Sequence, residues 1–183
     1  MKLASWNCRG LGSVSKAEAV MDLLKIEPSD ILLLQETKIE GRALLDISMS
    51  KWKKSAGKAV SSRGSSGGLA TLWTEDSFQL KRSHETQHWI FTELTHCASK
   101  LTISLFNLYV LVTYNEKREC WNSLSKFLDL HSPNNIILGG DLNIVMKPKE
   151  KRGGNSTRDQ LLPLVEEIIQ QRNLLDLDRK SVV

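Results

Sequence analysis

A short apolar run followed at once by polar residues constrains this chain more than any other feature. Residues 136–138 (Ile-Ile-Leu) are rich in β-branched side chains, which is typical of a buried strand. Two glycines then let the backbone turn tightly, and Asp141 and Asn143 follow them. These two side chains share one face wherever the backbone stays extended, because they are two positions apart. The segment predicts either a rigid polar site at a strand end or an ordinary turn, since Gly, Asp and Asn dominate turns.

The composition indicates one globular domain. The 183 residues are enough for one sizeable core, and 40% of them are hydrophobic while 25% are charged. We therefore expect a single domain over residues 1–183. No apolar run is long enough to cross a bilayer, and polar Asn7 comes too early for a signal peptide. Three distant cysteines without zinc-site spacing indicate free thiols in a reducing compartment. These features predict a nuclear or cytoplasmic protein that is not secreted and has no membrane partner.

The charge balance is mildly basic. A net charge of +4 and a pI near 9.0 allow a polyanionic partner without requiring one. Residues 51–63 hold several basic side chains around Trp52, and two interpretations are open. The favoured one is a solvated edge strand or loop protected by lysines, and the other is phosphate contact. The charged loop at residues 147–154 has the same two interpretations, and solvation is favoured because Glu150 dilutes its positive charge.

Hydrophobic patterning predicts a chain of alternating strands and helices. Besides 136–138, strands are expected over residues 2–8, 30–34, 68–73, 89–94 and 101–112. Helices are expected from a capping pair at Ser15 and Glu18 to just before Pro28, and over residues 41–50, 115–131 and 161–169. A hairpin is expected across residues 96–100. His84 and His88 lie in the polar approach to it, and we expect both to be exposed loop residues.

Polar residues close three of the expected strands. Asn7 ends the first, Glu36 follows the second, and Asp141 with Asn143 follows the last. Functional residues are often placed at strand ends by a rigid sheet. Carboxylate and amide oxygens are hard ligands that suit Mg²⁺, which prefers one or two carboxylates together with waters and a substrate phosphate.

Four motifs appear in order, each closing a strand. They are Trp6-Asn7-Cys8-Arg9-Gly10, Leu34-Gln35-Glu36-Thr37, Asn107-Leu108-Tyr109 and Gly140-Asp141-Leu142-Asn143. With them the sequence resembles the endonuclease/exonuclease/phosphatase superfamily, the group of DNase I and the apurinic/apyrimidinic endonucleases. Residues 6–12 and 137–154 look most like the endonuclease domain of plant LINE-type (non-LTR) retrotransposons. The resemblance covers residues 2 to about 178 and implies an α/β fold, the DNase I-like αββα four-layer sandwich.

The resemblance also implies a role for each site residue. Glu36 would hold a catalytic Mg²⁺, with Mn²⁺ as the alternative, and Asn7 would help to position metal or phosphate. Tyr109 would contact the scissile phosphate, Asp141 would orient or deprotonate the attacking water, and Asn143 would support the phosphate. The family reaction is in-line hydrolysis of a phosphodiester. In the retrotransposon branch it nicks target DNA to prime reverse transcription, so DNA is the expected partner and no small-molecule cofactor is expected.

Two features depart from the family pattern. The family has a proline after its Asn-x-Tyr segment, where Leu111 stands here, and this affects the stiffness of the loop. The family also closes with a Ser-Asp-His motif that is absent from these 183 residues. We therefore expect a sandwich truncated in its second half, with weak or no catalysis, because a general acid or base is worth about 10²–10⁴-fold in rate. Two alternatives are a catalytically dead relic that binds metal or nucleic acid, and another phosphoesterase of the same superfamily.

Overall fold

The computed structural model describes residues 1–11, 13–26, 28–64, 67–146 and 159–176. The charged loop expected at 147–154 therefore lies outside the described residues. The chain divides into two compact units. The first holds residues 1–111 and 133–143, and the second holds residues 112–132 and 144–183. Every predicted site residue belongs to the first unit.

The first unit contains two four-stranded sheets. One sheet has the spatial order β1 (Leu3–Asn7), β2 (Ile31–Gln35), β4 (Leu69–Thr74) and β3 (Ser55–Val60). Its β1 and β2 are parallel, so Asn7 lies opposite Gln35 and both strands end at the same edge. The helices α1 (Val14–Ile26) and α2 (Gly41–Lys51) contribute Met21 and Leu44 to a core on the sheet's outer face. This leaves its inner face for the second sheet.

The second sheet has the spatial order β5 (Phe78–Glu85), β6 (Trp89–His96), β7 (Thr102–Tyr109) and β8 (Ile136–Asp141). Strands β5, β6 and β7 form an antiparallel meander, and β8 joins β7 in parallel. The inner faces of the sheets share one core, in which Leu33 of β2 packs with Leu94 and Leu105. The sheets come so close at Gly139 that a Cβ there would lie 2.6 Å from Leu33 Cδ1. A glycine at this position therefore fixes the approach of β8 to the first sheet.

Buried polar side chains also join the two sheets. Asn107 of β7 is fully buried and donates from Nδ2 to the carbonyls of Leu34 (3.2 Å) and Ala70 (2.8 Å) in the first sheet. Its Oδ1 accepts a 2.7 Å hydrogen bond from Gln35 Nε2. Because an unpaired buried amide is costly, this network favours one register between the sheets.

The second unit contains α3 (Tyr114–His131) and α4 (Leu162–Gln171). The hydroxyl of Thr113 caps α3 by accepting a hydrogen bond from the Glu116 amide. Each helix buries one apolar face, with Leu124 and Val165 among the buried residues. Lys117 Nζ lies 2.7 Å from Asp159 Oδ2.

The α/β fold class expected from the sequence is confirmed, with some differences in its elements. Strand β5 was not expected, and β3 is the edge strand favoured for the lysine-rich segment. The first helix begins at Val14, and the hydroxyl of Ser13 rather than Ser15 accepts the Lys16 amide. His84 is an exposed strand residue of β5, whereas His88 is half-buried, so its expected exposure was wrong. Within the described residues, no helix is long and apolar enough to span a membrane.

Candidate active site

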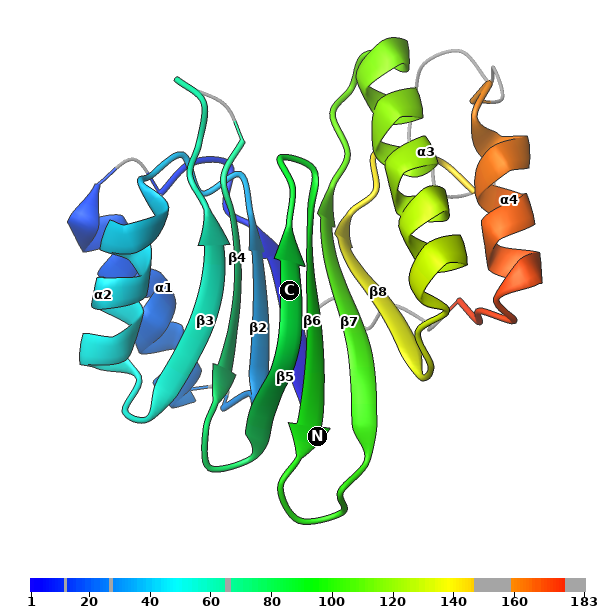
Figure 1. The fold of residues 1–183 in the computed structure, drawn as a ribbon. Helices are drawn as coiled ribbons and strands as arrows, with labels where there is room; N and C mark the ends of the chain where they lie inside the picture. The colour runs from blue at the N-terminus through cyan, green and yellow to red at the C-terminus, as the bar shows by residue number, and fades with distance from the viewer. Residues whose placement is uncertain (12, 27, 65–66, 147–158, 177–183) are drawn as a thin grey trace. The chain divides into compact units, whose positions relative to one another are not determined.

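The polar strand ends meet at one edge of the first unit. The amide Nδ2 of Asn7 donates to Glu36 Oε1 at 2.9 Å and to Asp141 Oδ2 at 2.6 Å. These residues end β1, follow β2 and end β8. Figure 1 shows the carboxyl ends of β2, β7 and β8 at the same upper edge, beside the turn that joins β5 to β6. One asparagine therefore ties together two carboxylates that come from different sheets.

The orientation of Asn7 is set by its own loop. Its Oδ1 accepts a 3.0 Å hydrogen bond from the backbone amide of Arg9, which leaves the NH₂ group facing both carboxylates. The loop is held to the first sheet by backbone bonds from Cys8 to Gln35 O (2.8 Å) and from Gly10 to Glu36 O (2.7 Å). In this arrangement Asn7 acts as a hydrogen-bond donor to both carboxylates, and the Arg9 amide occupies one of the two acceptor positions of its oxygen.

The Asp141 carboxylate is fixed from two sides. Asn7 donates to its Oδ2, and the backbone amide of Asn143 donates to its Oδ1 at 3.1 Å. The side-chain amide of Asn143 donates to the carbonyl of Val110, so it serves the loop rather than the open edge of the site. Gly140, which precedes Asp141, has φ +121°. The carboxylate therefore sits on a backbone conformation that favours glycine.

Tyr109 reaches the same edge through strand pairing. It ends β7 directly opposite Asp141 of β8, and paired residues of neighbouring strands have side chains on the same face. Asn107, two positions earlier, points its side chain to the first sheet, so Tyr109 shares that inner face. The five residues expected from the sequence thus come from one edge of one unit, and hydrogen bonds join Asn7, Glu36, Asp141 and Asn143 directly.

Two neighbours of Glu36 have no role assigned from the sequence. Lys38 Nζ lies 3.6 Å from Glu36 Oε2, and the two side chains are 34% and 19% exposed. Both residues adopt positive φ (+51° each). They therefore lie in an irregular turn, where side chains do not follow the spacing of a strand or a helix. Cys8 is the second neighbour, and burial and the nearby Glu36 charge raise the pKa of its thiol to about 12. Cys8 therefore stays protonated at neutral pH and is not a nucleophile.

The cluster provides oxygen ligands, but too few for a closed metal cage. Among the residues that the structure describes, no three His, Cys, Asp or Glu side chains lie close enough to hold a metal ion. Two carboxylates at an edge suit a cation that keeps several waters and binds a substrate phosphate, as Mg²⁺ does. The donor set therefore fits a shared metal–substrate site better than a structural metal site.

Comparisons with known proteins agree on the fold. The exodeoxyribonuclease of Bacillus subtilis (strain 168) is 27% identical over 183 residues, covering 87% of this chain and 68% of the relative. AP endonuclease LMAP from Leishmania major superposes with a TM-score of 0.67 at 18% identity, over 94% of this chain and 66% of that one. A mannosyl-6-phosphatase of Bacteroides thetaiotaomicron VPI-5482 superposes with a TM-score of 0.62 at 14% identity. The superposition covers 79% of this chain and 66% of the phosphatase chain. The chain thus spans about two thirds of the length of each.

A family model gives the most extensive match. The model described as Endonuclease/Exonuclease/phosphatase family matches residues 4–178. The match includes Asn7, Glu36 and Asp141, whose side chains form the hydrogen-bonded cluster. Because it spans nearly the whole chain, the chain belongs to the Endonuclease/Exonuclease/phosphatase family.

Proposed function

We propose that this chain hydrolyses a phosphodiester bond of DNA with the help of a divalent cation. The observation that carries the proposal is the pair of hydrogen bonds from the Asn7 amide to Glu36 and Asp141, at 2.9 and 2.6 Å. They gather two carboxylates at the open edge of a rigid pair of sheets. Family membership supports hydrolysis of phosphate esters as the reaction class.

Glu36 is the side chain proposed to hold the cation, and Asp141 lies beside it. Their oxygens are hard ligands, and Asn7 donates to one oxygen of each. When bound, Mg²⁺, or Mn²⁺ in its place, supplies positive charge that polarises a phosphate oxygen. Asn7 donates both hydrogens of its side-chain amide to the two carboxylates and keeps them together, so we assign it to positioning the metal site.

The remaining residues act on water and on phosphate. Asp141 accepts a proton from the attacking water, and the amides of Asn7 and Asn143 hold its carboxylate in place for this step. Tyr109, on the neighbouring strand β7, donates a hydrogen bond from its hydroxyl group to the scissile phosphate. Asn143 supports the phosphate indirectly, because its side chain fixes the loop through the Val110 carbonyl.

DNA is the proposed substrate because of the relatives and the charge. The Bacillus subtilis relative is an exodeoxyribonuclease and the Leishmania major structure is an AP endonuclease, so both names refer to nucleases. The net charge of +4 suits a polyanion. Residues 6–12 and 137–154 support a finer proposal, which is a retroelement endonuclease that nicks target DNA. The second candidate is a phosphoesterase for another substrate, favoured by the likeness to a mannosyl-6-phosphatase.

A plasmid-nicking assay tests the proposal. Supercoiled plasmid is incubated with the chain and Mg²⁺, with or without EDTA, and the conversion to open circles is followed. We expect EDTA to abolish nicking, and Asp141→Asn and Glu36→Gln each to lower the rate by about 10²-fold or more, because each removes a charged group of the site. Asp76→Asn is the matched control, since Asp76 is an exposed carboxylate in an ion pair with Lys54.

The outcomes separate the candidates. Nicking that is equal in the chain and its Asp141→Asn variant contradicts the proposal. Hydrolysis of sugar or inositol phosphates without nicking favours the second candidate. DNA binding without hydrolysis of either substrate favours a catalytically dead relic.

A further inference from the structure

The turn before β6 brings a histidine into line with two site residues. In the β6–β7 pairing, Trp89 lies opposite Leu108, so the next position along, His88, lies opposite Tyr109. The backbone agrees, because the Tyr109 amide donates to the His88 carbonyl at 2.8 Å. Tyr109 is in turn paired with Asp141 in β8. His88, Tyr109 and Asp141 thus form one row across three adjacent strands, at the edge where Asn7 binds Asp141.

Alternation along β6 gives the face of this histidine. Ile90 lies opposite Asn107, whose side chain reaches the first sheet, and Leu94 belongs to the core between the sheets. Even-numbered residues of β6 therefore face the first sheet. His88 is a bend residue directly before β6, and its backbone bond to Tyr109 extends the pairing and assigns it to the same face. The row of three side chains faces the same way as the Asn7–Glu36–Asp141 cluster.

The turn holds His88 firmly. The hydroxyl of Thr86 accepts hydrogen bonds from the amides of His88 (3.2 Å) and Trp89 (3.0 Å), and it lies 3.0 Å from the Trp89 carbonyl. The Thr86 amide also donates to the Trp89 carbonyl at 2.9 Å. These bonds fix the backbone at His88, so little backbone freedom is lost when its ring binds a ligand.

The imidazole of His88 has an unmet hydrogen-bonding capacity. The ring is half-buried, and its Nδ1 is fully buried without a hydrogen-bond partner among the described residues. Buried polar atoms are nearly always paired, so an unpaired one calls for an explanation. Since Nδ1 has no hydrogen-bond partner among the described residues, Nε2 is the ring nitrogen through which His88 can bind a ligand. The ring therefore offers a donor from the end of the row.

We propose that His88 is a further substrate-binding residue of this site, which donates from Nε2 to a non-bridging oxygen of the bound phosphodiester. The inference rests on the proposed function, because it requires a phosphate at the edge shared by Tyr109 and Asp141. It gives the site a donor that none of the four sequence motifs contains. On this proposal, the histidine is present at position 88 because its ring binds substrate. The cost of burying an unpaired Nδ1 then belongs to substrate binding and brings no gain in fold stability.

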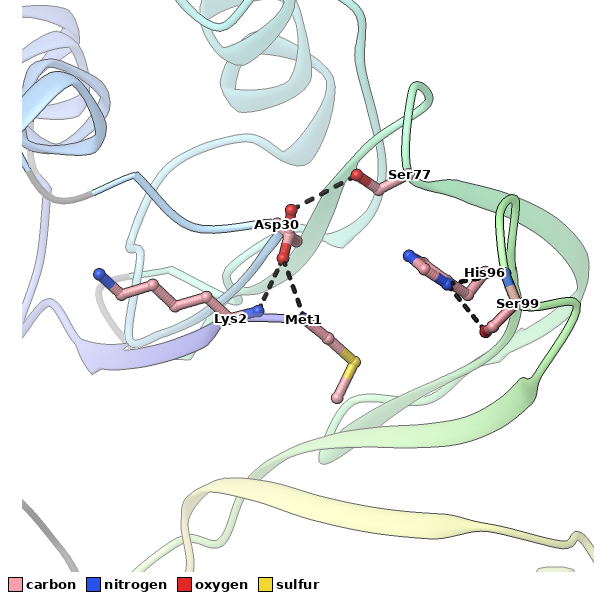
Figure 2. Close-up of polar contacts among 6 residues, drawn as sticks. All are labelled: Met1, Lys2, Asp30, Ser77, His96 and Ser99. Carbon is pink, nitrogen blue, oxygen red and sulfur yellow. Dashed lines mark hydrogen bonds and ion pairs between the residues drawn. The ribbon is translucent and has the colours of Figure 1, made fainter.

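The matched control comes from the opposite end of the same strand. His96 ends β6, and its Nδ1 already forms a 2.9 Å hydrogen bond with Ser99 Oγ, as Figure 2 shows. The neighbouring polar contacts in that view are also structural, since Asp30 binds the Lys2 amide at 2.7 Å and the Ser77 hydroxyl at 3.4 Å. A His96→Leu variant therefore removes an imidazole from β6 without touching the row.

Three variants are compared in two assays, which are nicking with Mg²⁺ and oligonucleotide binding by fluorescence anisotropy with EDTA. We expect His88→Leu to raise the KM for nicking and the Kd for the oligonucleotide about five- to tenfold. His88→Gln keeps a donor and should recover more than half of this loss, and His96→Leu should match the wild type. The urea midpoint of His88→Leu should equal or exceed that of the wild type, because the variant removes an unpaired buried nitrogen.

The outcomes distinguish this inference from the proposed function. Nicking that depends on Asp141 but is unchanged in His88→Leu overturns the role of His88 and leaves the function standing. A lowered urea midpoint with unchanged KM and Kd makes His88 a structural residue and also overturns the inference. Without Asp141-dependent nicking the proposed function fails. In that case the oligonucleotide Kd tests the binding role of His88. The role is supported only if the His88→Leu variant binds the oligonucleotide more weakly than the His96→Leu variant does.

Discussion

Gly140 shows how strictly single residues shape the site. It adopts φ +121°, and a Cβ there would lie 2.1 Å from the Leu108 carbonyl oxygen and 2.8 Å from the Leu108 amide. Both atoms belong to the backbone of the neighbouring strand β7, so neither can move aside as a flexible side chain would. Any side chain at Gly140 would displace the adjacent Asp141.

We predict that Gly140→Ala lowers the free energy of unfolding by more than about 3 kcal/mol, because strain at positive φ adds to a backbone clash. Gly64→Ala is the control, since Gly64 also has positive φ (+60°) but no atom within 4 Å of its Cβ position. That variant should lose only about 1 kcal/mol. Urea unfolding of the two proteins measures the difference. Equal losses would contradict the clash and leave only the shared backbone strain.

The sequence predicted the central residues of the site better than their neighbours. Asn7 and Asp141 end their strands and Glu36 directly follows one, and because parallel strands end at a common edge, such residues converge. Lys38 has no such signal, because its position depends on an irregular turn. His88 could not be assigned either, because its place depends on the pairing of β6 with β7. The roles of the five predicted residues await the nicking assay.

At the scale of the elements, Asn107 connects the two sheets. We predict that Asn107→Leu lowers the free energy of unfolding by about 2–4 kcal/mol, because it leaves Gln35 Nε2 without its 2.7 Å acceptor in the interior. Ser5 is exposed, and its hydroxyl is the other hydrogen-bond partner of Gln35. The Ser5→Ala variant should therefore lower the free energy of unfolding by less than about 1 kcal/mol. Urea denaturation compares the single variants.

A double variant gives the sharper test of this connection. Replacing Gln35 and Asn107 by leucine together removes both polar partners, so the double variant should be more stable than the sum of the single losses implies. Strictly additive losses would show that the two amides do not act as a pair.

A continuous apolar run made a strand easiest to predict. Strand β2 is buried along its whole length, and its run of leucines is unmistakable. Strand β5 was missed because it lies at a sheet edge, with only Phe78 fully buried and polar or charged residues over most of its length. A register shift between Leu80 and Arg82 further interrupts its alternation. Edge strands of this kind depend on pairing with a neighbour, which local sequence does not encode.

At the scale of the whole molecule, the net charge is +4, but carboxylates neutralise much of the lysine-rich segment at residues 51–63. Lys54 lies 2.8 Å from Asp76, and Lys58 lies 3.8 Å from Glu85. Strand β3, which carries Lys58, is at the edge of its sheet, where lysines discourage strand addition. These contacts favour the solvated edge strand over the phosphate-contact interpretation of this segment.

The salt dependence of DNA binding tests that assignment. A lysine that contacts phosphate adds about one unit to the slope of log K against log salt, because it releases a counterion. We predict that Lys54→Ala combined with Lys58→Ala changes this slope by less than about half a unit, since each lysine is already paired with a carboxylate. The matched control, Asp76→Ala with Glu85→Ala, frees both lysines and should also leave the slope unchanged. A lysine variant whose slope falls by about two units would instead place DNA along β3.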